Sequence, residues 1–329
     1  MKKVLIVFLI CFTAVCKICA QFDGQYSQYV NNLAVINPAN CGAQSMMQVS
    51  ILQRTQWLGF KGAPIVSMLS VDAPFKIGKS ENGAGIQFLS DIFGVFNNQQ
   101  VNFAYSHRFK IKGNHLAAGV NLGFVNLICN AGDKNSNNNS GKDSTNARLV
   151  HLIESEYHKI NDEFIPDDKQ SGIGFDLGFG VQYLAQKWRV GFSVAHLNHP
   201  KMHLGDKFVF DIKPFYMLHG GYDIATSNPN YGLRANLLVS SDLISWTFHA
   251  SLIMDIKEKF WAGLGYRLGN DISFMFGMKL FEGFKIGYTF DLPTTQFIAA
   301  SAGSHEFFAS YEFALVREKS KAYKSIRIL

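Results

Sequence analysis

Apolar and polar residues alternate along much of this chain with a period of two, which is the spacing of side chains on one face of a β-strand. In residues 272–280 every second residue is apolar, and the residues between them are small or charged except for Met275. The same alternation runs through residues 284–292, and only Glu282 and Gly283 separate the two stretches. Such a short connection is typical of a β-hairpin. The pattern therefore predicts antiparallel strands that pair with their neighbours in the sequence.

Similar stretches recur along the chain and predict about fourteen strands. They are expected near residues 46–58, 65–75, 84–92, 98–111, 114–128, 171–185, 187–197, 212–225, 230–241, 243–257, 259–269, 271–281, 283–292 and 305–316. Connections after the even-numbered strands are short. The long connections all follow odd-numbered strands and lie at residues 129–170, 198–211 and 293–304. Membrane barrels alternate short periplasmic turns with longer external loops, and a sheet in lipid must close to satisfy its backbone. The sequence thus predicts an all-β fold, a transmembrane antiparallel up-and-down β-barrel of about 14 strands.

Composition narrows the choice of membrane protein. Hydrophobic residues make up 47% of the chain and aromatic residues 14%, which suits a well-ordered protein. After the first twenty residues, no stretch approaches the ~18 consecutive apolar residues of a membrane-spanning helix. A helical membrane protein is therefore excluded.

The first twenty residues have the features of a secretory signal peptide. Lys2 and Lys3 precede an apolar run at residues 4–12, and the small residues Cys19 and Ala20 form the expected cleavage site. The run is too short to span a bilayer as a helix, and no cysteine follows a small residue as lipidation requires. We expect cleavage after Ala20 and export to the outer membrane of a Gram-negative cell. The expected organisation is a signal peptide (1–20), an N-terminal segment that faces the periplasm or plugs the lumen (21–44), an outer-membrane barrel (45–316) and a basic C-terminal tail (317–329).

Cysteines and charges add little to this picture. Only Cys41 and Cys129 remain after the expected cleavage, so one disulfide is the most that could form, and the sequence leaves open whether they pair. The formal net charge is +6, and lysines gather at the predicted periplasmic turns and in the tail. These lysines fit an ordinary solvated rim or, alternatively, a surface that docks an acidic periplasmic partner.

The sequence carries no clear catalytic or metal-binding motif. The chain has no nucleophile elbow, paired-carboxylate constellation or metal-binding helix that rises above chance. His196, His199 and His203 match no common metal spacing, and we interpret them as part of a solvated external loop. The glycines of residues 172–180 alternate within one strand, which favours small lumen-facing residues over a phosphate loop. We expect no enzyme activity, no cofactor and no metal.

Five short blocks of sequence resemble the PorP/SprF family of type IX secretion proteins. They are QYSQY at residues 25–29, NPANCG at 37–42, RTQWLG at 54–59, GAP at 62–64 and GSHE at 303–306. Because the blocks lie at both ends of the chain, with a compatible strand pattern between them, the resemblance covers essentially the whole chain after the signal.

The resemblance implies an outer-membrane component of the type IX secretion and gliding machinery of Bacteroidota. By this resemblance the protein is expected to contact periplasmic lipoproteins and ring subunits, and members encoded beside large cell-surface adhesins support the export or surface attachment of that cargo. Outer-membrane lipid is a further expected partner, and nucleic acid is not. The candidate partner-binding residues are Tyr26, Gln28, Tyr29, Asn37, Pro38, Arg54, Trp57, His305 and Glu306.

Two other functions stay open on the sequence alone. A FadL-like or porin-like transporter of small hydrophobic solutes also has fourteen strands and an Asn-Pro-Ala near its N-terminus, so residues 37–39 fit both families. A structural barrel with no cargo is the third possibility. The sequence does not identify the cargo, the oligomeric state or the role of residues 129–170, nor does it say whether the lumen is open.

Overall fold

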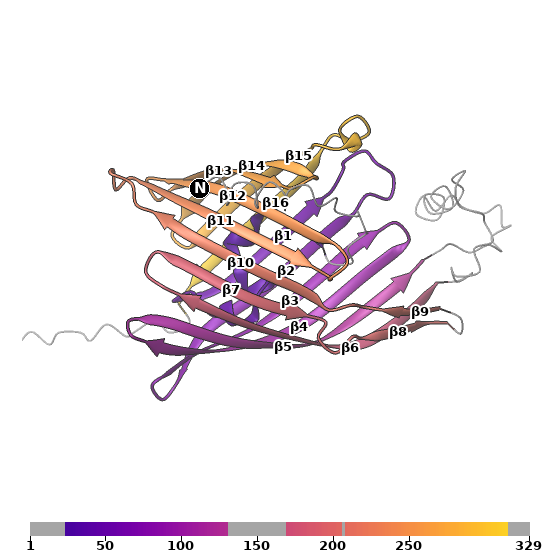
Figure 1. Cartoon of the computed structure of the whole chain (residues 1–329), viewed down its shortest axis with the longest axis horizontal. Helices are drawn as coiled ribbons and strands as arrows, with labels where there is room; N and C mark the ends of the chain where they lie inside the picture. The colour runs from indigo at the N-terminus through magenta and orange to yellow at the C-terminus, as the bar shows by residue number, and fades with distance from the viewer. Residues whose placement is uncertain (1–23, 131–168, 206–207, 315–329) are drawn as a thin grey trace, which may run out of the picture.

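Fourteen antiparallel strands close into a barrel in the computed structural model, which describes residues 24–130, 169–205 and 208–314 (Figure 1). Each barrel strand pairs with its neighbours in the sequence, and β1 pairs with β16 to close the sheet. The strands are β1 (Met47–Thr55), β2 (Ile65–Ile77), β3 (Ser80–Phe93), β4 (Phe96–Ile111), β5 (Asn114–Cys129), β6 (Gln170–Leu184), β7 (Trp188–Ala195), β10 (Phe215–Ile224), β11 (Tyr231–Ser241), β12 (Trp246–Ile256), β13 (Phe260–Arg267), β14 (Asp271–Phe281), β15 (Phe284–Pro293) and β16 (Ser304–Phe313). This confirms the predicted fold class.

The predicted alternation separates an apolar outer wall from an inner face that holds buried polar residues together with smaller apolar clusters. In β1 the buried Gln48, Ser50 and Arg54 face inward, whereas Ile51 is exposed on the outside. Register pairs continue this outer row from Ile51 through Leu69, Phe88, Val101 and Phe124 across β1 to β5. An outer wall of this kind suits a bilayer, since all backbone hydrogen bonds stay within the closed sheet. No helix among the described residues is both long and apolar enough to cross a membrane.

The two ends of the barrel differ in their connections. Turns at residues 78–79, 112–113, 257–259 and 282–283 lie at the end where β1 starts and β16 finishes. The connections that contain residues 131–168 and the β8–β9 hairpin lie at the other end. Because short turns face the periplasm in membrane barrels, we assign the first end to the periplasm.

The long connection expected at residues 198–211 is present between β7 and β10, and it contains a two-stranded hairpin that the sequence did not predict. It consists of β8 (Lys201–Leu204) and β9 (Phe208–Asp211). Met202 and Leu204 of β8 are buried against Val125 and Leu127 on the inner face of β5. The apolar side chains gain burial by packing on the sheet, a contact that their local sequence does not reveal.

The start of the described chain lies inside the barrel. We call residues 24–42 the inner segment. It forms three short 3₁₀ helices, η1 (Gln28–Asn31), η2 (Leu33–Val35) and η3 (Pro38–Asn40), and a fourth such turn, η4 (Gln296–Ile298), lies between β15 and β16. Polar residues at inward-facing positions of the wall bind the inner segment along its length, as described below.

Candidate functional site

A buried ionic cluster lies on the lumen side of the seam between the first and last strands. Arg54 of β1 is in register with Glu306 of β16, and its Nη1 lies 3.0 Å from Glu306 Oε2 and 2.5 Å from Asp291 Oδ2 of β15. All three side chains are completely buried. Burying a charge costs several kcal/mol unless partners compensate it, and removal of one partner from such a group costs about 3–5 kcal/mol. The three side chains are therefore interdependent.

A second buried ion pair lies beside the first. Arg267 of β13 places its Nη1 2.6 Å from Asp271 Oδ2 of β14. Its Nη2 also donates a hydrogen bond to the hydroxyl of Ser27 at 3.1 Å. The two ion pairs thus meet at one residue of the inner segment.

The inner segment binds these charged groups through its backbone and side chains. The backbone N–H of Ser27 donates to Glu306 Oε2 at 2.9 Å, and that of Gln28 donates to Glu306 Oε1 at 2.6 Å. The Ser27 hydroxyl donates to Asp291 Oδ2 at 3.0 Å. Hydrogen bonds to an ionised acceptor are among the stronger ones in proteins. The cluster therefore fixes the start of the inner segment to three strands of the wall.

Two asparagines of the inner segment bind the wall further along. The side-chain amide of Asn32 donates to the hydroxyls of Ser50 (2.6 Å) and Ser70 (2.5 Å). Asn37 donates to the backbone carbonyl of Val181 at 3.0 Å, while its side-chain oxygen accepts from the N–H of Ala39 at 2.9 Å. Asn37 thereby caps η3 and joins it to β6.

Glycines in the wall make room for η3. A Cβ on Gly119 of β5 would lie 2.4 Å from the Pro38 carbonyl carbon, and a Cβ on Gly180 of β6 would lie 2.1 Å from Asn37 Oδ1. Real side chains do not approach so closely. The alternating glycines of β6 are thus small lumen-facing residues, as the sequence suggested. One of them, Gly180, allows residues 37–39 to lie close to the wall.

The end of the inner segment is held at the periplasmic side. The Cys41 carbonyl accepts hydrogen bonds from the Ser106 hydroxyl (2.6 Å) and from Arg108 Nη2 (2.9 Å), and the Gly42 N–H donates to Asp72 Oδ2 (2.7 Å). Burial raises the pKa of the Cys41 thiol to about 12; the nearby Asp72 charge acts in the same direction and the Arg108 charge in the opposite one. Cys41 and Cys129 are both buried free thiols, so they do not pair.

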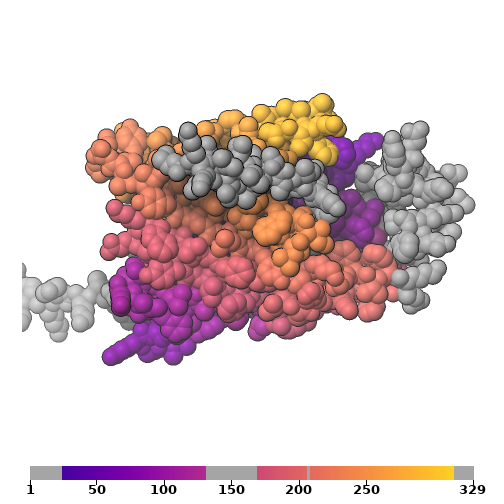
Figure 2. All heavy atoms as spheres, in the orientation of Figure 1, coloured from indigo at the N-terminus to yellow at the C-terminus, as the bar shows by residue number. Residues whose placement is uncertain are grey.

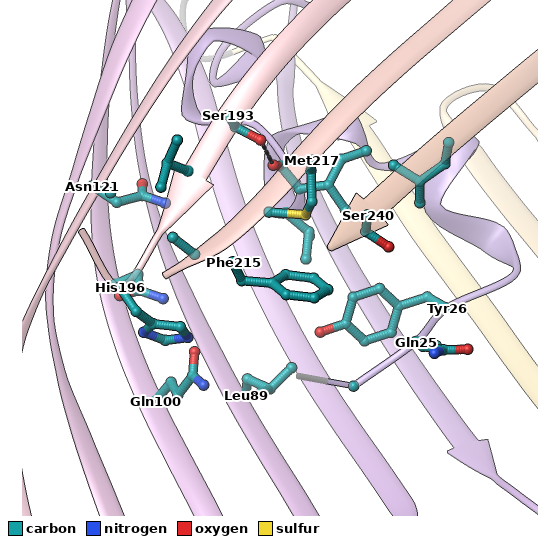
Figure 3. A pocket seen from close by; sticks show the side chains of 18 of the residues that line it. Gln25, Tyr26, Leu89, Gln100, Asn121, Ser193, His196, Phe215, Met217 and Ser240 are labelled. Atoms are coloured by element: carbon teal, nitrogen blue, oxygen red, sulfur yellow. Dashed lines mark hydrogen bonds between the residues drawn. The ribbon is translucent and has the colours of Figure 1, made fainter. Parts of the chain in front are cut away.

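A cavity of about 90 Å³ remains between the inner segment and the wall (Figure 3). Tyr26 and Phe215 point toward one another across it, while His196, Gln100 and Asn121 supply polar groups from the wall. This volume accommodates a few water molecules rather than a large solute. Within the described residues, no group of three or more metal-ligating side chains occurs.

The interpretation of the three histidines as one solvated loop is wrong for His196. This residue follows β7, points into the barrel, and lies 2.9 Å from Asp176 Oδ1 through its Nδ1. His199 and His203 are exposed. The positive φ of His196 (55°) turns the chain at this point, and sequence spacing alone did not indicate the turn.

Comparison with known proteins identifies the family. Residues 18–311 match the family described as "Type IX secretion system membrane protein PorP/SprF". This chain belongs to the PorP/SprF family. The resemblance drawn from the short sequence blocks is therefore confirmed, and family and fold together support an outer-membrane location.

A search of the curated proteins finds no match to this PorP/SprF chain. Among solved structures, the toluene transporter TbuX of Ralstonia pickettii is 10% identical with a TM-score of 0.47, and the match covers 85% of this chain and 93% of that one. The CymD monoaromatic hydrocarbon channel is 11% identical (TM-score 0.45, 90% and 95% covered). The outer membrane protein Omp33 of Acinetobacter baumannii is 7% identical (TM-score 0.45, 83% and 100% covered).

The structure brings most of the predicted site residues of this PorP/SprF protein together in the lumen. They are Tyr26, Gln28, Tyr29, Asn37 and Pro38 of the inner segment, and Arg54 and Glu306 of the wall. Because most of these side chains are buried, a partner reaches them only if the inner segment moves. Their role in partner binding stays a prediction.

Two predicted residues lie elsewhere. Trp57, in the β1–β2 connection, stacks on Phe297 with ring centroids 4.3 Å apart. His305 is on the outer wall, where its Nδ1 lies 2.7 Å from the Tyr288 hydroxyl. Sequence reasoning missed wall residues that hold the inner segment, namely Asp72, Ser106, Arg108, Arg267 and Asp291. The available signal was a polar or charged residue at an inward-facing position of a strand.

Proposed function

We propose that this PorP/SprF protein is a non-enzymatic outer-membrane component of the type IX secretion and gliding machinery, in which it supports the export or surface anchoring of an adhesin cargo. Family membership supports the assignment to the secretion system. The presence of the inner segment in the lumen supports a role in anchoring and recognition. Since residues 24–42 are hydrogen-bonded to the wall at both ends and in the middle, the barrel is suited to anchoring and recognition rather than to conduction.

Periplasmic subunits and lipoproteins of the machinery are the proposed partners. The buried residues Tyr26, Gln28 and Tyr29 contribute to such a contact only in a state where the inner segment has left the wall. Alanine replacement of the three residues is then expected to abolish co-purification with periplasmic components while the barrel stays folded. Unchanged co-purification removes them from the interface.

Deletion of the gene tests the function directly. The expected result is that the surface adhesin is lost from the cell exterior and gliding stops, as measured by protease shaving and by cell tracking. Expression of the wild-type chain in the deletion strain restores both. Export and gliding that persist, together with impaired uptake of fatty acids, support the solute transporter instead.

A transporter of hydrophobic solutes needs a path with apolar lining. In this lumen the described cavity is small, and its lining combines apolar side chains such as Leu89 and Phe215 with polar groups of Gln100, Asn121 and His196. A solute could pass only after the inner segment had been displaced. These observations favour the secretion role.

A further inference from the structure

Two hairpins extend the barrel wall at its periplasmic end. The pairing of β2 with β1 stops at Asp72, opposite Gln48, whereas β2 and β3 stay paired to Ile77 and Ser80. Pairing of β4 with β5 likewise continues to Ile111 and Asn114. These violet hairpins project beyond the neighbouring strands at lower left in Figures 1 and 2.

The extension carries an unbalanced positive charge. Residues 73–83 and 106–116 contain five basic residues and one acidic residue, Glu81. We call the five the periplasmic basic surface: Lys76, Lys79, Arg108, Lys110 and Lys112. Among them, within the described part of the chain, only Lys110 forms an ion pair, with its Nζ 2.8 Å from Glu81 Oε1. The remaining lysines are exposed.

The opposite side of the periplasmic rim has mixed charge. The β12–β13 turn contains Lys257, Glu258 and Lys259, and Lys285 of β15 pairs with Glu312 of β16 at 2.5 Å. Acidic and basic residues therefore alternate there, and among the described residues the larger excess of positive charge lies on the β2–β5 side.

We infer that the periplasmic basic surface docks an acidic segment of a periplasmic protein. This inference rests on the proposed function, because a secretion component must meet its machinery on the periplasmic side. Complementary charge raises the rate of encounter and selects among partners. Several lysines on two adjacent hairpins provide such complementarity to a run of Asp and Glu side chains.

Orientation of the side chains favours a protein over lipid head groups. Lys76 and Lys110 each lie four residues beyond a lumen-facing residue of the same strand, Asp72 and Ser106 respectively. Because side chains alternate along a strand, the two lysines are on the lumen side of the sheet. The outward positions hold exposed apolar residues instead, namely Phe75, Ile77, Phe109 and Ile111. Those apolar side chains are on the side of the bilayer, whereas Lys76 and Lys110 are on the side of the barrel mouth, away from lipid.

The basic surface also borders the inner segment. Arg108, which belongs to it, donates the 2.9 Å hydrogen bond to the Cys41 carbonyl. A carboxylate bound beside Arg108 competes with that carbonyl for the guanidinium, because charged acceptors form the stronger hydrogen bond. Docking at this surface therefore acts on the contact that holds the end of the inner segment.

Binding of a fluorescent oligoglutamate peptide to the purified mature protein in nanodiscs tests the inference. The variant K76E/K79E/K112E spares Lys110 and its ion pair, and K257E/K259E/K279E is a matched control with the same change of charge on the other side of the rim. We expect affinity to fall at least ~10-fold in the first variant and to change less than ~2-fold in the control. Equal losses in both variants, or no binding by the wild type, overturn the inference.

Photo-crosslinking in cells identifies the natural partner. A photoreactive residue at position 79 is expected to give protein adducts that map to an acidic segment, and the same residue at position 258 to give none of them. Adducts with lipid alone at position 79 overturn the inference. Electrophoretic mobility with and without heating checks that each variant retains a folded barrel.

The proposed function and this inference fail in different ways. If deletion of the gene stops adhesin export but K76E/K79E/K112E exports normally, and K76E/K112E keeps the crosslinks from position 79, the docking surface is wrong and the function stands. If the crosslinks to an acidic partner are found but deletion leaves export intact, the surface stands and the function is wrong.

Discussion

Arg54 is the residue at which the contacts of the lumen converge. Its guanidinium joins Asp291 and Glu306, and through them it fixes the backbone of Ser27 and Gln28. The cluster lies inside the protein, so water cannot replace a missing partner. A single substitution at Arg54 therefore leaves two buried carboxylates without the cation that pairs with both of them.

Arg54→Met is expected to destabilise the barrel by about 3–5 kcal/mol, because it leaves a buried charge uncompensated. Urea unfolding of the protein in lipid vesicles, followed by tryptophan fluorescence, measures the change. Lys285→Met is the control, since its ion pair with Glu312 is partly exposed and contributes at most about 1 kcal/mol. A triple variant R54M/D291N/E306Q should recover much of the loss. Similar effects at Arg54 and Lys285 would contradict the importance of the cluster.

Gly180→Val tests whether close packing of η3 against the barrel wall holds the inner segment in place. The Cβ at this position meets Asn37 Oδ1, so we expect the inner segment to leave the wall while the barrel stays closed. Reaction of Cys41 with a maleimide at pH 8, in a Cys129→Ser background, reports the movement. In the parent the raised pKa keeps the thiol protonated below about pH 12 and unreactive. Release returns the pKa toward its ordinary value and speeds labelling.

Gly232→Ala serves as the control for this experiment. A Cβ there meets nothing closer than Asp255 at 3.6 Å, an ordinary contact. Labelling of Cys41 should therefore stay slow. Fast labelling in the parent protein would show that the inner segment is not held as the structure indicates.

At the residue scale, sequence predicted only part of the site. The two-residue period showed that Arg54 and Asp291 lie on strands, but not that residues 237 positions apart form an ion pair. Glu306 and the inner segment were recognised through the family resemblance. Asp72 and Arg108 were missed because their partners are backbone groups of residues 41 and 42, which no side-chain pattern records.

At the scale of the element, the lipid-facing side of each strand made the strands predictable. A bilayer demands an apolar residue at every second position, and β12 to β15 follow that demand closely. Their ends were less certain, because polar turns replace the pattern there. Asp242 Oδ1, for example, accepts from the N–H groups of Ile244 and Ser245, and β12 starts only at Trp246.

The β8–β9 hairpin escaped prediction because its stability comes from packing on another element. Met202→Ala is expected to detach the hairpin while the barrel remains intact, since loss of a buried methionine costs about 2–5 kcal/mol. Limited proteolysis should then cleave between residues 196 and 214. Val209→Ala, at an exposed position of the same hairpin, should leave the pattern of fragments unchanged. Resistance of both variants would show that the hairpin does not depend on this cluster.

At the scale of the whole molecule, the inner segment occupies the lumen, and we expect it to block conduction. Deletion of residues 24–42 is expected to produce open pores in planar lipid bilayers, because it removes the groups that fill the lumen of fourteen strands. The full-length protein should show little or no steady conductance under the same conditions. Equal conductance of the two proteins would mean that the segment does not obstruct the lumen in a membrane.

The position of the ionic cluster has a consequence for assembly. Its groups come from β1, β15 and β16, so the cluster is incomplete until the C-terminal strands have joined the sheet. The N-terminal residues that bind to it must wait for the last part of the chain to arrive. The start of the inner segment therefore becomes anchored only after the barrel is complete. In a product truncated before β15 and β16, it would stay unanchored.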